Sequence, residues 1–154
     1  MIQPFLSRFT SACLIVTFFI PFTACEPSQP TLTFDVSISD GLVDEAKDGR
    51  LLLLLSTDDS REPRFQISDG PGTQLVFGQN VEGISANQSI RFNKEHFGYP
   101  IQSIDNLKPG EYWGQALLHT YETFNLSTGH TVKLPMDNGE GQQWNRSPGN
   151  LYST

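Results

Sequence analysis

Apolar and polar residues alternate with a period of two along several short stretches of this chain, a pattern typical of half-buried β-strands. Residues 32–38 show it first, with an apolar side chain at every second position. The five leucines at 51–55 are instead apolar on both faces, so we expect residues 50–56 to form a central strand. Turn-forming residues separate the other candidates. Further strands are predicted at 65–67, 74–77, 89–92, 110–121, 131–134 and 150–153.

About seven short strands with no convincing helix between them predict an all-β protein, and the spacing favours a β-sandwich of the immunoglobulin or fibronectin type III kind. Residues 93–100 are expected to form one helical turn or an irregular loop. Pro109 and Gly110 supply a turn directly before a strand that opens with Tyr112. This arrangement predicts a tyrosine corner, in which the hydroxyl of Tyr112 bonds back to the corner. The alternative is that Tyr112 is an ordinary aromatic strand residue.

The amino terminus carries an apolar segment, residues 12–24, that follows one positive charge at Arg8 and ends directly before Cys25. Such a segment is shorter than the roughly 20 residues that cross a bilayer, so residues 1–24 are predicted to be a signal peptide. The position of Cys25 favours a bacterial lipoprotein signal, in which this cysteine is acylated. An ordinary signal peptide cut near Ala24 is the alternative. Under either alternative we expect an exported protein, and with the lipid anchor we expect a periplasmic or outer-membrane lipoprotein of the bacterial cell envelope.

After that cut, proline and polar residues at 25–30 predict an extended tether, and residues 31–154 form a single β-sandwich domain. Removal of Arg8 leaves 9 basic and 17 acidic residues, a net charge of about −8. This balance argues against nucleic acid as a partner, because phosphates require a basic face. It also argues against electrostatic docking on anionic lipid, so membrane attachment would depend on the lipid anchor at Cys25.

Catalytic and metal-binding motifs are missing from the sequence. A serine hydrolase usually carries Gly-x-Ser-x-Gly, and no such segment occurs here. The three histidines, His96, His119 and His130, are isolated along the chain and are expected to be structural or surface residues. Neither His-Glu-x-x-His nor paired cysteines occur, so no metal and no cofactor are predicted.

Large aromatic residues mark the candidate binding or interface surface. Trp144 is the most informative, because it lies in the polar, glycine-rich segment 139–150. An exposed tryptophan there would mark a contact surface, whereas a tryptophan that tucks back would pin the loop, and both alternatives stay open. The candidate binding or interface residues are Trp113, Tyr121, Gln143, Trp144 and Arg146.

The segment 130–153 resembles the end of the amino-terminal region of exported bacterial esterases related to the enterochelin-esterase-like (esterase D-like) α/β hydrolases. Segments 48–53, 56–65, 110–113 and 121–124 agree with this resemblance. It implies an immunoglobulin-like domain that precedes a catalytic α/β-hydrolase domain. In the resembled proteins the chain continues past Asn-Leu-Tyr-Ser into the hydrolase, whereas this sequence stops at Thr154. The domain is therefore expected to be truncated, and no catalytic residue is carried over.

Two functions follow from these observations. The first is a non-catalytic accessory domain that packs on, or positions, the hydrolase domain of an exported esterase. The second is a free-standing lipoprotein that binds glycans through an aromatic surface. Whether the chain takes part in catalysis is left open, since no catalytic apparatus is recognisable in it.

Overall fold

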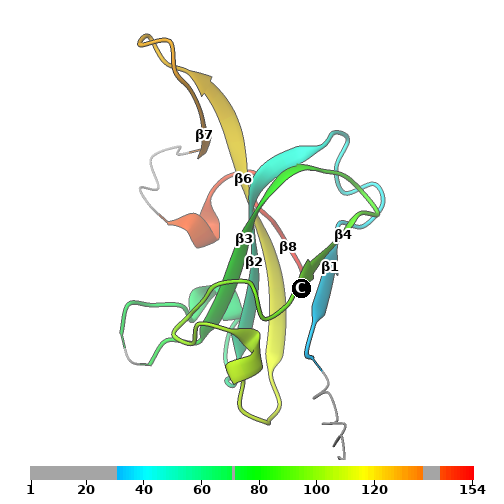
Figure 1. Ribbon diagram of the computed structural model, residues 1–154, viewed down its shortest axis with the longest axis vertical. Helices are drawn as coiled ribbons and strands as arrows, with labels where there is room; N and C mark the ends of the chain where they lie inside the picture. Colours follow the sequence, from blue (N-terminus) through cyan, green and yellow to red (C-terminus); the bar gives the residue numbers. More distant parts are fainter. Residues whose placement is uncertain (1–30, 71, 137–142) are drawn as a thin grey trace, which may run out of the picture.

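The computed structural model describes residues 31–70, 72–136 and 143–154, so the predicted signal peptide, Cys25 and the tether lie outside the described residues. The described chain is all-β, as predicted, with strands in two sheets and three short 3-10 helices (Figure 1). The strands are β1 (Phe34–Ser37), β2 (Lys47–Ser56), β3 (Leu75–Ile84), β4 (Ser89–Phe92), β5 (Gly98–Tyr99), β6 (Trp113–Asn125), β7 (Thr131–Pro135) and β8 (Leu151–Tyr152). The 3-10 helices are η1 (Pro63–Phe65), η2 (Ile104–Asn106) and η3 (Trp144–Arg146).

All pairings between these strands are antiparallel. The large sheet has the order β5-β3-β2-β6-β7, and β8 also pairs with β6. Strand β6 is long enough to serve two partners on one edge, with β8 opposite Leu117 and Leu118 and β7 opposite residues 121–125. Beyond β8, the hairpin of β6 and β7 projects past the other strands (Figure 1). The small sheet contains β1 and β4.

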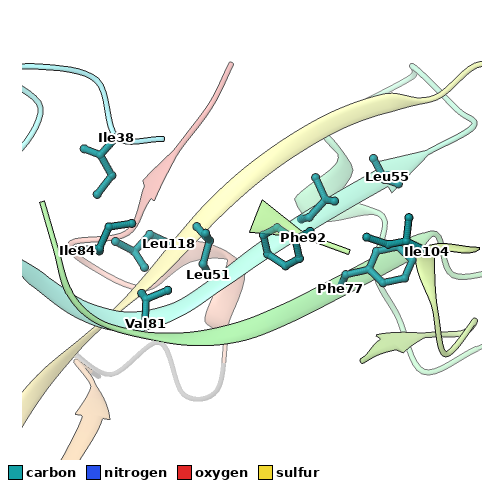
Figure 2. Close-up of a cluster of buried hydrophobic side chains, with 10 residues drawn as sticks. Ile38, Leu51, Leu55, Phe77, Val81, Ile84, Phe92, Ile104 and Leu118 are labelled. Carbon is teal, nitrogen blue, oxygen red and sulfur yellow. The ribbon is translucent and has the colours of Figure 1, made fainter. Parts of the chain in front are cut away.

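Strand β2 is central, as its leucines predicted, with β3 on one side and β6 on the other. Successive side chains of a strand point to opposite faces, so the leucines divide into two sets. Leu51, Leu53 and Leu55 join the main core, which also contains Phe77 and Leu118 (Figure 2). Leu52 and Leu54 join a second cluster on the other face of the sheet.

The small sheet covers the inner face of the large one in a sandwich-like arrangement. Phe92 from β4 is fully buried in the main core (Figure 2). Phe34 and Val36 from β1 pack against this core. Full burial of a phenylalanine contributes about 1.5–3 kcal/mol, so Phe92 and Phe77 are major stabilising residues of this core.

Local structure differs from prediction at three places. Residues 65–67 are not a strand, because η1 occupies residues 63–65 and Pro63, at the start of that helix, lacks the N–H that a sheet ladder needs. The strand expected at 74–77 runs on to Ile84. Within 93–100 the chain takes the loop alternative, but it leads into the short strand β5, which was not predicted.

The Tyr112 hydroxyl donates a hydrogen bond to the Lys108 carbonyl at 2.9 Å. The ring packs against the main core, and Pro109 and Gly110 form the intervening exposed turn. This is the geometry that the tyrosine-corner hypothesis requires.

Candidate functional site

The outer face of the large sheet, opposite the face that β1 and β4 cover, carries several of the candidate residues. Directly opposed residues of antiparallel strands point to the same side of a sheet. On β2 and β6 the outer-face pairs are Asp48 with Tyr121, Arg50 with His119, Leu52 with Leu117, Leu54 with Gln115, and Ser56 with Trp113. Trp113 and Tyr121 therefore share this face, but at about 3.3 Å per residue they lie roughly 26 Å apart along β6. Trp113 is 45% exposed.

Trp144 covers the middle of the outer face. It is half-buried and packs against Leu52, Leu54 and Leu117. Of the two alternatives that the sequence left open, the half-buried packing of Trp144 corresponds to the tucked arrangement. Its part in a contact surface stays a prediction. Gln143, the preceding residue, is exposed.

Hydrogen bonds hold the segment 144–150 on the sheet. The Asn150 amide donates to the Trp144 carbonyl at 2.7 Å, and the Asn150 side-chain oxygen lies 2.9 Å from Nδ1 of His119. Asn145 donates to the Arg64 carbonyl at 3.0 Å. Since His119 is buried and committed to this contact, its role here is structural.

Gln115 is the centre of a buried polar network below this segment. Its Oε1 accepts from the Arg64 backbone N–H at 3.1 Å, and its Nε2 donates to Glu62 Oε2 at 2.9 Å and to the Ser153 carbonyl at 2.8 Å. A buried amide with both ends satisfied fixes the groups around it. Gln115 thus joins β6 to the segment that contains η1 and to the end of β8.

Two arginines and two aromatic rings meet beside β8. The Cζ atom of Arg64 lies 3.6 Å from the Tyr152 ring centroid and 4.6 Å from that of Phe65, while Cζ of Arg146 lies 5.1 Å from the Phe65 centroid. These distances are within the range of cation–π attraction. We call Arg64, Phe65, Arg146 and Tyr152 the arginine–aromatic cluster. Together with Ser147 and Asn150 it lines a cleft of 460 Å³.

The two arginines differ in exposure and in partners. The side chain of Arg64 is 11% exposed and forms an ion pair with Glu62. Its Nε lies 2.8 Å from Glu62 Oε2 without hydrogen-bond geometry, while its Nη2 donates to Glu62 Oε1 at 3.4 Å. Hydrogen bonds from Gln115, and then from Arg64, hold the pKa of Glu62 below its usual value. Arg146 is exposed, and none of the described carboxylates lies within ion-pair distance of it.

A second cleft, of 660 Å³, lies beside the start of β2 and the second half of β6 and contains the candidate Tyr121. Its walls are polar and include Glu45, Lys47 and Asp48. The ammonium of Lys133 lies 2.8 Å from Asp48 and, mainly by hydrogen bonding, lowers the pKa of that carboxyl.

The structure thus brings together only some of the binding or interface residues that the sequence predicted. Trp144 and Arg146 share η3, whereas Trp113 and Tyr121 lie far from each other on β6. Arg64, Phe65 and Tyr152 were not anticipated as functional candidates. The sequence signal that could have identified Arg64 and Phe65 was Pro63. A proline favours the start of a helix rather than a strand, so the two residues after it would not be expected in a sheet.

The other two histidines differ from each other: His96 is held by hydrogen bonds, and His130 is a surface residue. Nδ1 of His96 accepts from the Asn93 N–H at 3.1 Å, so its Nε2–H faces Gln79 Oε1 at 3.0 Å. His130 is exposed between β6 and β7. Within residues 31–154, apart from 71 and 137–142, no three metal-ligating side chains gather. In that same part of the chain, no helix has the length and apolar character of a membrane span.

No protein-family profile, curated protein or solved structure matches this chain.

Proposed function

We propose that this chain is the non-catalytic accessory domain of an exported esterase and that it packs against an α/β-hydrolase domain. The strand pairing supports the immunoglobulin-like assignment that the resemblance implies. Strand β1 pairs with β4, and β2, β6 and β8 are neighbours in that order. In the immunoglobulin fold strands B and E are neighbours, and strands C, F and G are neighbours in that order. We therefore equate β1 with B, β4 with E, β2 with C, β6 with F and β8 with G. Tyr112 then stands at the start of the strand equivalent to F, where a tyrosine corner belongs.

The observation that carries the proposal is the exposed aromatic surface at β8. Tyr152 is 46% exposed, and it lies in the Asn-Leu-Tyr-Ser segment from which the resembled proteins continue into their hydrolase. A hydrolase joined there would lie beside Tyr152 and the arginine–aromatic cluster. Interfaces between domains of one chain are modest in area and fairly polar, which suits this mixture of rings and guanidinium groups.

The non-catalytic role is supported by the chemistry of the histidines. His96 and His119 each have a side-chain partner that fixes the ring, and neither has a serine as that partner. The hydrolase would therefore supply the nucleophile and base.

The same proposal places the protein in the bacterial cell envelope as a lipoprotein acylated at Cys25. Metabolic labelling with a fatty-acid analogue tests the anchor. Label on the wild-type chain and none on a Cys25→Ser variant supports it, whereas equal labelling of both chains contradicts it.

Association with a hydrolase is tested in two steps. DNA sequencing beyond the Thr154 codon, in all three frames, should find a hydrolase with a Gly-x-Ser-x-Gly segment. Calorimetric titration of this chain with that hydrolase should then give saturable binding that Tyr152→Ala weakens at least tenfold. Arg91→Ala, on the small sheet, is the matched control and should bind normally. If no hydrolase is encoded nearby, or if Tyr152→Ala binds as tightly as wild type, the proposal is wrong.

The Tyr121 cleft favours a second candidate function, glycan binding by a free-standing lipoprotein. An aromatic ring beside carboxylates and hydroxyls offers both a stacking face and hydrogen-bond partners for a sugar. Titration of the full chain with a panel of oligosaccharides, followed by intrinsic fluorescence, tests this candidate. A response that Tyr121→Ala abolishes supports it, and a flat response across the panel counts against it.

A further inference from the structure

We infer that the 460 Å³ cleft beside β8 binds a small organic carboxylate, which Arg146 holds by its guanidinium group. This inference goes beyond the proposed function and does not depend on it, because the cleft is formed entirely by residues of this chain. In a two-domain protein the same cleft would lie at the domain boundary, where ligand sites are common.

The charge of the cleft favours an anionic ligand. Its lining among the described residues contains two guanidinium groups and no carboxylate, in a chain with 17 acidic and 10 basic residues. Glu62, which is not one of the lining residues, balances the charge of Arg64. None of the described carboxylates balances the charge of Arg146. A local positive potential on an otherwise acidic surface attracts anions to this place.

The segment that carries Arg146 is held in place by contacts within the protein. The backbone N–H of Arg146 donates to the Gln143 carbonyl at 2.9 Å, and the two-way contact between Asn145 and Arg64 holds η3 against η1. Trp144 packs on the leucines of the sheet beneath. The backbone that carries Arg146 is therefore fixed before any ligand arrives, which lowers the entropy lost on binding.

The lining also favours one class of ligand. A guanidinium presents parallel N–H groups that match the two oxygens of a carboxylate. The rings of Phe65 and Tyr152 line the same cleft. Arg64 stacks on the Tyr152 ring, but Tyr152 is still 46% exposed, so an apolar, planar body attached to the carboxylate has ring surface to contact. A bare inorganic anion would not contact this remaining ring surface. The cleft therefore favours an aromatic or similar planar carboxylate over acetate or phosphate.

The test is a titration of the full exported chain with sodium benzoate, followed by NMR of the arginine Nε–Hε and backbone amide signals. Benzyl alcohol, which has the ring without the charge, and inorganic phosphate, which has the charge without the ring, are the comparison ligands. We expect saturable shifts at residues 64–65 and 146–152 with benzoate and at least tenfold weaker binding of either comparison ligand. Binding of benzoate should also weaken as sodium chloride is added.

Three variants make the test specific. Arg146→Ala should weaken benzoate binding at least tenfold, and Arg146→Lys, which keeps the charge but loses the fork, should weaken it severalfold. Arg91→Ala is the matched control and should bind as wild type does. Arg146 is exposed, so these variants are expected to fold, and their amide spectra check this directly. Equal binding by Arg146→Ala and wild type, or equal binding of phosphate and benzoate, would overturn the inference. Failure to find a hydrolase would leave it intact.

Discussion

Replacement of Gln115 by leucine tests the central claim about the outer face, namely that one buried amide holds three segments together. Gln115 is 4% exposed and makes hydrogen bonds to Arg64, Glu62 and Ser153. Leucine has nearly the same volume, so the change removes the hydrogen bonds with little change in packing.

The expected loss of stability depends on whether each former hydrogen-bond partner of Gln115 can bond to water instead. The Glu62 side chain is 45% exposed and Ser153 lies near the surface, so both find water. The N–H of Arg64 belongs to a residue that is 9% exposed, and leaving it without a partner costs about 1–3 kcal/mol. With the smaller net loss of the two donated bonds, we expect Gln115→Leu to lower the free energy of unfolding by about 2–3 kcal/mol.

The assay is urea unfolding at neutral pH, followed by the fluorescence of Trp113 and Trp144. Gln102→Leu is the matched control, because Gln102 is exposed and its side chain has no hydrogen-bond partner among the described residues. Surface changes of this kind usually alter stability by less than about 0.5 kcal/mol. If Gln115→Leu is no more destabilising than Gln102→Leu, the network does not hold these segments and the reasoning fails.

Three further predictions concern the corner, the core and the response to pH. Tyr112→Phe should lower the free energy of unfolding by about 0.5–1.5 kcal/mol, the net value of one hydrogen bond, and urea unfolding should show an unchanged m-value. Gly98→Ala should destabilise by about 1–3 kcal/mol in thermal melts, because its Cβ would meet the buried ring of Phe77, and melting at the wild-type temperature would contradict this close approach. Hydrogen bonds from basic side chains lower the pKa of Asp35 and Asp48, so their stabilising contribution is complete above the unfolded pKa near 3.9 and disappears as pH falls through the lower folded values. Urea midpoints should therefore be constant from pH 7 to about 5 and fall below about pH 4, and a midpoint that rises on acidification would refute this assignment.

The central part of the fold was predictable because its signal is local. Five consecutive leucines bounded by turn residues leave few alternatives to a strand buried on both faces. The second half of β3, residues 78–84, contains two glycines and three polar residues, and its own β-propensity is poor. It becomes a strand because β2 offers it a partner edge. At residues 65–67 the local pattern instead predicted a strand that does not form. Their apolar and polar residues alternate as in a strand, but Pro63 starts a 3-10 turn.

The candidate site was less predictable because its contacts are not local. Arg64 and Arg146 meet over the Phe65 ring although about 80 residues separate them in the sequence. The burial of Trp144 also depends on leucines that are remote in the sequence. The loop sequence alone therefore left both alternatives for this residue open. Arg146 was a candidate because it lies close to Trp144 in the sequence, and its role in binding stays a prediction. Nothing near Tyr152 indicated that a guanidinium would stack on its ring.

The central position of β2 has a consequence for how the chain folds. One neighbour, β3, follows it closely, but Leu52 pairs with Leu117 in β6, some 65 residues further along. Contacts over such separations form slowly, because the loop between them must be closed before any pairing stabilises it. Until then the strip of leucines has one unpaired edge and two uncovered faces, which is the condition under which nascent chains aggregate. We therefore expect refolding yield to fall steeply with protein concentration, and a chaperone that shields extended apolar segments to restore it.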